Sequence, residues 1–441
     1  MRDLAVGRPG TARGGRSVLA ICLACIVFEG YDLVAYGTAL PAILADPRWG
    51  LGSAYAGLIA SYALVGMLVG SLLAGAVADF SGRRWLVIGS TAWFSAWMAV
   101  TAVATSLTVF GLARFMVGVG VGALIPTAAA LAVEFAPPGR ENTHSAIVWA
   151  GYPGGGVLAA LLGLLLLEPF GPRSLFWLGV LPLVTVVPLA LRFLPESPSF
   201  LALRGRHEEA ARVARRYGLS LAAAEGAGNE KSGRKGPLAL FDRGRRTTTV
   251  LMGLMSAGGL LLTYGLNTWL PQLMRSSGYA LGSALAFLLV LNAGAILVPL
   301  FASRAADRIG PQKIVALSFA SAAVAISLLS MKLPALGLYV LTFIAGAGTI
   351  GAQVLVYGFA ATYFPTTCRA AGLAWTASVG RLGGITGPTL AGLLIAAGYG
   401  VASNFYVFAA VALFAALCAA IVPRRPAETR TAVKSPLDTA R

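Results

Sequence analysis

The strongest constraint on the fold is a series of long apolar segments that recurs from residue 17 to residue 422. Each has about 20 residues or more, enough for a helix to cross a hydrocarbon core of about 30 Å. Only 12% of the residues are charged, whereas a soluble domain has about 25%. A membrane helix satisfies its own backbone hydrogen bonds, so the pattern predicts an all-α polytopic membrane protein with twelve transmembrane helices. The expected helices cover residues 17–40, 55–78, 85–105, 107–135, 143–167, 174–193, 247–270, 281–303, 313–331, 334–363, 370–397 and 402–422.

The basic residues are divided unequally between the two ends of these helices. Of the 34 Lys and Arg residues, 28 lie in segments that the helix order places on one side, and 4 lie on the other. Cytoplasmic loops carry such an excess. We therefore expect a multi-pass protein of a bacterial-type inner membrane, with both termini in the cytoplasm. The net charge of +17 follows from this asymmetry, so we expect the lipid bilayer as a partner and no nucleic acid. We also expect a functional monomer.

The two halves of the chain repeat each other. Motif residues recur at one separation of 228 (307 − 79, 310 − 82, 343 − 115 and 346 − 118), which indicates two pseudo-symmetric six-helix bundles with the site between them. The central loop contains an expected amphipathic helix at 207–217 and a flexible linker at 225–236. The predicted organisation is a cytoplasmic tail (1–16), an N-terminal bundle (17–193), a cytoplasmic central loop (194–246), a C-terminal bundle (247–422) and a second cytoplasmic tail (423–441).

These motifs resemble those of the major facilitator superfamily. The segment from Asp79 to Arg84 is similar to that superfamily's loop motif between helices 2 and 3, and the segment 307–310 to its second copy. More narrowly, the chain resembles the aromatic acid–proton symporters, which carry benzoate-type and hydroxybenzoate-type acids. The resembling segments are 28–37, 262–274 and 380–388, and the first departs from the family signature in having Glu29 instead of Asp. The resemblance implies the major facilitator fold and no cofactor beyond the proton as coupling ion.

Two acids and one arginine inside the membrane are the candidates for proton coupling. Glu29 and Asp32 are three residues apart and share a helix face. Counting a rise of about 1.5 Å per residue from the helix ends places Asp32 and Arg114 at similar depth, so we expect them to pair. Charged residues are costly in a bilayer and commonly mark proton pathways. The alternative is a static pair with no role in turnover.

A second arginine is the candidate for substrate binding. Arg381 lies near the midplane, and the expected helices 7, 8, 10 and 12 contain no acid to neutralise it. A guanidinium suits a carboxylate, so we expect an anionic substrate. The alternative is neutralisation by Asp32, Glu29 or backbone carbonyls. The further substrate-binding candidates, which are alternatively packing residues between helices, are Tyr36, Tyr264, Asn267, Thr268 and Gln353.

The charged residues at the cytoplasmic helix ends have a different expected role. The family resemblance implies that they latch the two halves together in one conformation, whereas the alternative is that they are solvated loop charges. The latch candidates are Asp79, Gly82, Arg83, Arg84, Glu134 and Asp307.

The sequence thus predicts a secondary active transporter that takes up a small aromatic carboxylate with a proton by alternating access. The alternatives are a proton-driven exporter and, from another class, a transporter-like ligand sensor. We do not expect an enzyme, because no metal-ligand spacing is visible and the chain has only 2 His.

Overall fold

The computed structural model describes residues 11–137, 139–219, 240–241, 245–331, 333–365 and 368–423. Within these ranges the protein contains helices and no strands, and twelve helical spans are long and apolar enough to cross a membrane. The predicted linker at 225–236 and most of the two predicted tails lie outside the described residues.

The first bundle contains six spans, five of which are continuous helices. The sixth was expected as one helix over 174–193 but is broken near Gly179 and at Thr185. Pro188 has no backbone N–H for the carbonyl four residues earlier, which weakens a helix there. The elements are α1 (Thr11–Ala45), α2 (Ser53–Ser81), α3 (Arg83–Val103), α4 (Leu107–Glu134), α5 (Glu141–Phe170), and α6 (Arg173–Leu178), α7 (Leu181–Val184) and α8 (Val186–Phe193) for the sixth span.

The second bundle follows two short helices, of which α10 coincides with the amphipathic helix predicted at 207–217. Its fourth span, predicted as one helix over 334–363, contains a π-helical segment beside Gln353; such segments often mark functional sites. The two short helices are α9 (Pro198–Leu203) and α10 (His207–Tyr217). The elements of the second bundle are α12 (Arg246–Ser276), α13 (Leu281–Ile309), α14 (Pro311–Leu328), α15 (Ala335–Gly346), η2 (Ala347–Gly351), α16 (Ala352–Tyr363), α17 (Arg369–Ala396) and α18 (Val401–Ile421).

The repeat extends to the closest helix contacts. Gly118 of α4 lies against the backbone of Ala63 in α2, and Gly346 of α15 lies against the backbone of Leu291 in α13. The two contacts are related by the same separation as the sequence motifs, since 346 − 118 equals 291 − 63. A Cβ at either glycine would overlap a carbonyl oxygen, so only glycine allows this approach. The two bundles therefore share packing as well as sequence.

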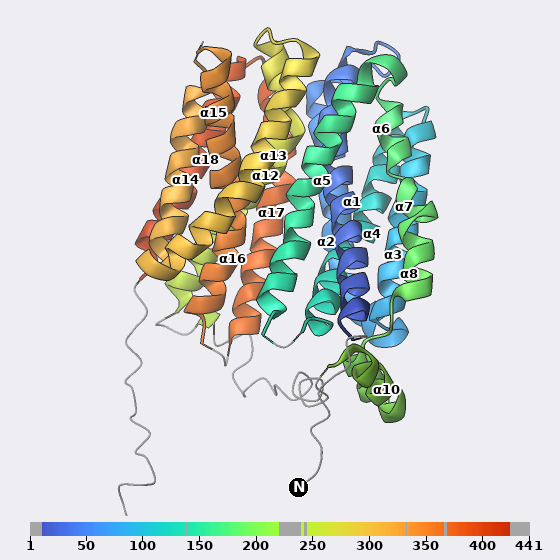
Figure 1. Ribbon diagram of the computed structural model, residues 1–441. Helices are drawn as coiled ribbons and strands as arrows, with labels where there is room; N and C mark the ends of the chain where they lie inside the picture. The colour runs from blue at the N-terminus through green and yellow to red at the C-terminus, as the bar shows by residue number, and fades with distance from the viewer. Residues whose placement is uncertain are drawn as a thin grey trace, which may run out of the picture.

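The two bundles stand side by side, and α10 lies beyond one end of the first (Figure 1). We call the end where α1 begins the proximal side and the opposite end the distal side. In the distal half, Ser61 of α2 donates to the carbonyl oxygen of Ile385 in α17 at 2.6 Å, and Arg275 donates to that of Pro41 at 2.9 Å. These bonds join the two bundles on the distal side.

Near its proximal end, helix α2 is exposed around much of its circumference. Residues 75–77 are all exposed, although successive residues on a helix point about 100° apart. Among the hydrogen bonds that join the two bundles in the described ranges, the one between Arg381 and Ser71 lies nearest the proximal end. The structure is therefore closed on the distal side and parted on the proximal side.

Candidate functional site

The ion pair expected from depth counting is present in the first bundle. Arg114 Nη1 of α4 donates to Asp32 Oδ1 of α1, and both side chains are 1% exposed. The Arg114 guanidinium also lies 5.7 Å from the centroid of the Tyr36 ring. Asp32 Oδ2 and Arg114 Nε have no hydrogen-bond partner among the described residues. A buried pair with unsatisfied atoms is costly to keep, which suits groups that exchange partners during a cycle.

Two tyrosine hydroxyls fix the position of α1 around this pair. Tyr31 donates to the carbonyl oxygen of Leu175 at 2.7 Å, and Tyr36 donates to that of Ala56 at 2.8 Å. The hydroxyl of Tyr36, a predicted substrate contact, is therefore engaged with α2. Only its ring is free to face a ligand.

Glu29 lies one helical turn before Asp32 and is 2% exposed. Its carboxylate makes no hydrogen bond or ion pair with any residue that the structure describes, and its electrostatic neighbours are Asp32, Tyr152 and Tyr264. Holding a charged carboxylate in an apolar interior without a partner costs free energy. Glu29 therefore stays a candidate for carrying a proton, by itself and apart from the Asp32–Arg114 pair.

A small central cavity lies between the two bundles. It has room for about one water molecule. It brings Arg114 together with four of the predicted substrate residues; its lining is Leu33, Tyr36, Ala60, Leu64, Arg114, Tyr264, Asn267 and Thr268.

Asn267 has a second role in this conformation. Its Oδ1 accepts a hydrogen bond from Asn292 Nδ2 at 2.9 Å, and its backbone lies against Gly37 of the other bundle. Asn267 thus packs helices together while it lines the cavity, as its alternative interpretation proposed.

Arg381 lies between the two bundles, where α17 meets α2. It donates to Ser71 Oγ of α2, and it forms no ion pair with any described acid. Helix α17, which contains Arg381, and helix α12, which contains Tyr264, both begin on the proximal side. Arg381 stands fewer residues from the start of its helix (381 − 369) than Tyr264 does from the start of its own (264 − 246). Because a helix rises about 1.5 Å per residue, Arg381 is nearer the proximal opening than Tyr264 and the central cavity.

Gln353 lies at a level similar to that of Arg381. Helix α16 ends on the proximal side, and Gln353 stands nearly as far from that end as Arg381 does from its own (363 − 353 against 381 − 369). Its Nε2 donates to Ser256 Oγ at 2.9 Å, and its Oε1 is buried without a partner in the described chain. The predicted substrate residues therefore form two groups. Arg381 and Gln353 lie nearer the proximal ends of their helices than the residues of the central cavity do.

The sequence interpretation missed Tyr152 of α5. Its ring meets that of Tyr264 edge-on, with centroids 6.3 Å apart and planes at 87°, and thereby joins the two bundles. Its hydroxyl is buried without a described partner. The repeat contained a signal for it, since Pro153 is the counterpart of Arg381 (381 − 228) and Tyr152 is its neighbour.

The latch candidates lie mostly at the proximal end of the first bundle. Arg83 Nη1 of α3 pairs with Glu134 Oε2 of α4 at 2.8 Å. Glu134 Oε1 accepts from Ser197 Oγ at 2.8 Å and from the Ser199 amide at 2.9 Å, which ties α9 to the bundle.

The remaining latch candidates are divided between the two bundles. Gly82 has a φ of +87° and permits the sharp turn between α2 and α3, while Arg84 borders the same turn. Asp79 and Asp307 are exposed and form no ion pair with any residue in the described ranges. In this conformation the cluster joins parts of the first bundle, and the structure does not bring Asp307 to it.

Comparison with known proteins decides the family. The family described as sugar (and other) transporter matches residues 18–429. The chain belongs to this family, and its fold is that of the major facilitator superfamily. It is therefore a multi-pass membrane transporter and not an enzyme.

Relatives with known names narrow the class. A gentisate transporter of Corynebacterium glutamicum is 34% identical over 93% of this chain and 88% of its own length. A benzoate transport protein of Acinetobacter baylyi is 31% identical over 91% and 87%. The solved structure of the xylose transporter XylE from E. coli, at 18% identity, covers 92% of this chain and 97% of that chain with a TM-score of 0.72, and supports the fold.

Proposed function

We propose that the protein takes up a small aromatic carboxylate together with a proton. The observation that carries the proposal is Arg381, a cation between the two bundles without a carboxylate partner in the described chain. A cation there suits a ligand that brings its own negative charge. The gentisate and benzoate transporters among the relatives support an aromatic acid as that ligand.

The proton is assigned to the acids of α1. Protonation of Asp32 removes the charge that holds Arg114, and the substrate anion offsets the charge of Arg381. The proton and the substrate anion together add no net charge, so the loaded carrier can move one bundle against the other without bringing additional charge into the membrane. Release of both loads on the other side resets the cycle. No cofactor other than the proton is required, and one copy of the chain suffices.

The distribution of basic residues supports a cytoplasmic proximal side, with both termini in the cytoplasm of a bacterial-type cell. The described conformation is then the inward-facing one, with the Tyr152–Tyr264 contact and the distal hydrogen bonds closed toward the outside. Alternating access would require these contacts to open while the proximal ends close.

The test is uptake of labelled gentisate, benzoate and 4-hydroxybenzoate by vesicles that contain the purified protein. An acidic outside should drive saturable accumulation of at least one acid, and a protonophore should abolish it. Benzamide, which keeps the ring and lacks the carboxylate, should not compete. Accumulation driven by an acidic inside would instead support an exporter and contradict the proposal. Vesicles without protein correct for diffusion of the undissociated acids.

A further inference from the structure

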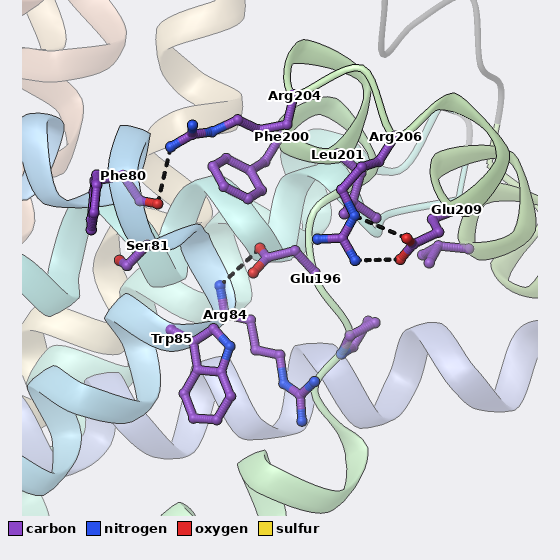
Figure 2. A pocket seen from close by; sticks show the side chains of 12 residues that line it. Phe80, Ser81, Arg84, Trp85, Glu196, Phe200, Leu201, Arg204, Arg206 and Glu209 are labelled. Carbon is purple, nitrogen blue, oxygen red and sulfur yellow. Dashed lines mark hydrogen bonds and ion pairs between the residues drawn. The ribbon is translucent and has the colours of Figure 1, made fainter.

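A second site lies on the proximal side, away from the central cavity. Its cavity of about 810 Å³ is formed where the turn between α2 and α3 meets α9 and α10. Figure 2 shows three arginines, Arg84, Arg204 and Arg206, around it, with Glu196 among them and Glu209 on the outer side of Arg206. The formal charge of these five side chains is +1. The transport cycle proposed above uses none of these five side chains.

The two acids of this cavity are already engaged. Glu196 Oε1 accepts from the Arg84 amide at 3.1 Å and the Ser197 amide at 2.9 Å, so its charge caps the start of α3. Glu209 receives two hydrogen bonds from Arg206, at 2.9 and 2.6 Å, which hold the pKa of Glu209 below its usual range. The negative charges in the cavity are thus satisfied.

The other two arginines are oriented without being neutralised. Arg204 Nη2 donates to the carbonyl oxygens of Asp79 and Phe80, at 2.7 and 3.1 Å. Arg84 Nη2 donates to the carbonyl oxygen of Leu191 at 2.7 Å, and its buried Nε has no partner in the described chain. Neutral carbonyls leave both guanidinium charges uncompensated, which favours an anion with oxygen acceptors.

The surroundings of the cavity point to a lipid as the source of that anion. The cavity lies where the α2 span ends and the α3 span begins, so we expect it near the headgroups of the bilayer. Its lining includes two large exposed apolar side chains, Phe80 (84% exposed) and Trp85 (53%), and Leu203, next to Arg204 in the chain, is 77% exposed. Aromatic residues at a membrane boundary contact the interface, and basic clusters beside it attract anionic lipids. A soluble anion would make no use of these apolar side chains.

We propose that this cavity binds the headgroup phosphate of an anionic phospholipid. The phosphodiester carries one negative charge, which matches the +1 of the cavity. Its oxygens accept from Arg84 and Arg204, and its acyl chains leave along Phe80 and Trp85. A bound lipid would hold α9 and α10 against the membrane surface.

The experiment measures lipid retention by native mass spectrometry of the full chain, in equimolar phosphatidylglycerol and phosphatidylcholine. The wild type should retain phosphatidylglycerol preferentially. Arg84→Gln/Arg204→Gln should lower this preference about tenfold, since two charged hydrogen-bond donors are lost. Arg215→Gln/Arg216→Gln, on exposed positions of α10 outside the cavity, is the matched control and should behave as the wild type.

Two further variants guard against misfolding. Arg206→Gln, at an exposed position, should weaken the preference without affecting the elution profile, and Arg204→Lys should keep part of it because the charge remains. Equal retention of both lipids by the wild type, or an unchanged preference in the double variant and in Arg206→Gln, would overturn the proposal. Displacement of the lipid by millimolar inorganic phosphate would show a site for a soluble anion and overturn it as well.

Discussion

Asp32→Asn is expected to abolish proton-driven accumulation of the substrate while leaving exchange of labelled for unlabelled substrate measurable. Asparagine cannot take up a proton, so the variant has lost the group to which we assign coupling. It resembles a protonated Asp32, which allows the loaded carrier to move in both directions. The measurement compares uptake driven by an acidic outside with counterflow in vesicles at equal pH. Normal gradient-driven accumulation would remove Asp32 from the mechanism.

The same substitution leaves Arg114 buried and charged without its partner. Breaking a buried pair in this way costs about 3–5 kcal/mol, so a lower thermal stability in detergent is expected. Asp32→Asn/Arg114→Gln removes both charges and should recover much of this stability without restoring coupling. Asp46→Asn is the matched control, because Asp46 pairs with Arg48 in an exposed loop and should not affect transport.

Arg381→Gln is expected to raise the KM for the aromatic acid by about 10- to 100-fold. Hydrogen bonds to charged groups contribute about 1.5–3 kcal/mol, and about 1.4 kcal/mol corresponds to a factor of ten. Arg381→Lys keeps the charge but not the paired donors, so its KM should lie between those of the wild type and Arg381→Gln. The measurement is initial uptake rate against substrate concentration in vesicles with equal amounts of folded protein.

Two controls separate substrate binding by Arg381 from its contact with Ser71. Ser71→Ala removes the described partner of Arg381 and keeps the cation, so its KM should be unchanged or lower. Arg48→Gln removes an exposed arginine in the loop between α1 and α2 and should leave transport unchanged. An unchanged KM in Arg381→Gln, or an equal rise in Ser71→Ala, would contradict a direct contact between Arg381 and the substrate.

The sequence predicted features that depend on length and depth. The length of the apolar segments predicted the spans, and counting residues from the helix ends predicted that Asp32 and Arg114 pair. The equal separations of glycines predicted a repeat, which the contacts of Gly118 and Gly346 extend to packing. Each of these depends on one helix, or on two helices counted from a common membrane boundary.

Counting residues along helices could not predict which residues of the two bundles face each other. Membrane helices are apolar on most faces, so periodicity does not say which face meets the other bundle. The contacts of Tyr152 with Tyr264 and of Arg381 with Ser71 also belong to one conformation of a structure that is parted on one side. Prolines within apolar segments gave a local signal for the broken sixth span, but hydropathy alone predicted a continuous helix.

The most direct test of the proposed coupling is the pH of a weakly buffered medium around vesicles when gentisate is added. Wild-type protein should make the medium more alkaline at the rate at which labelled gentisate enters, beyond the signal of vesicles without protein. Vesicles with Asp32→Asn should match the protein-free signal. Entry of labelled gentisate with no pH change, or with acidification of the medium, would contradict proton-coupled uptake.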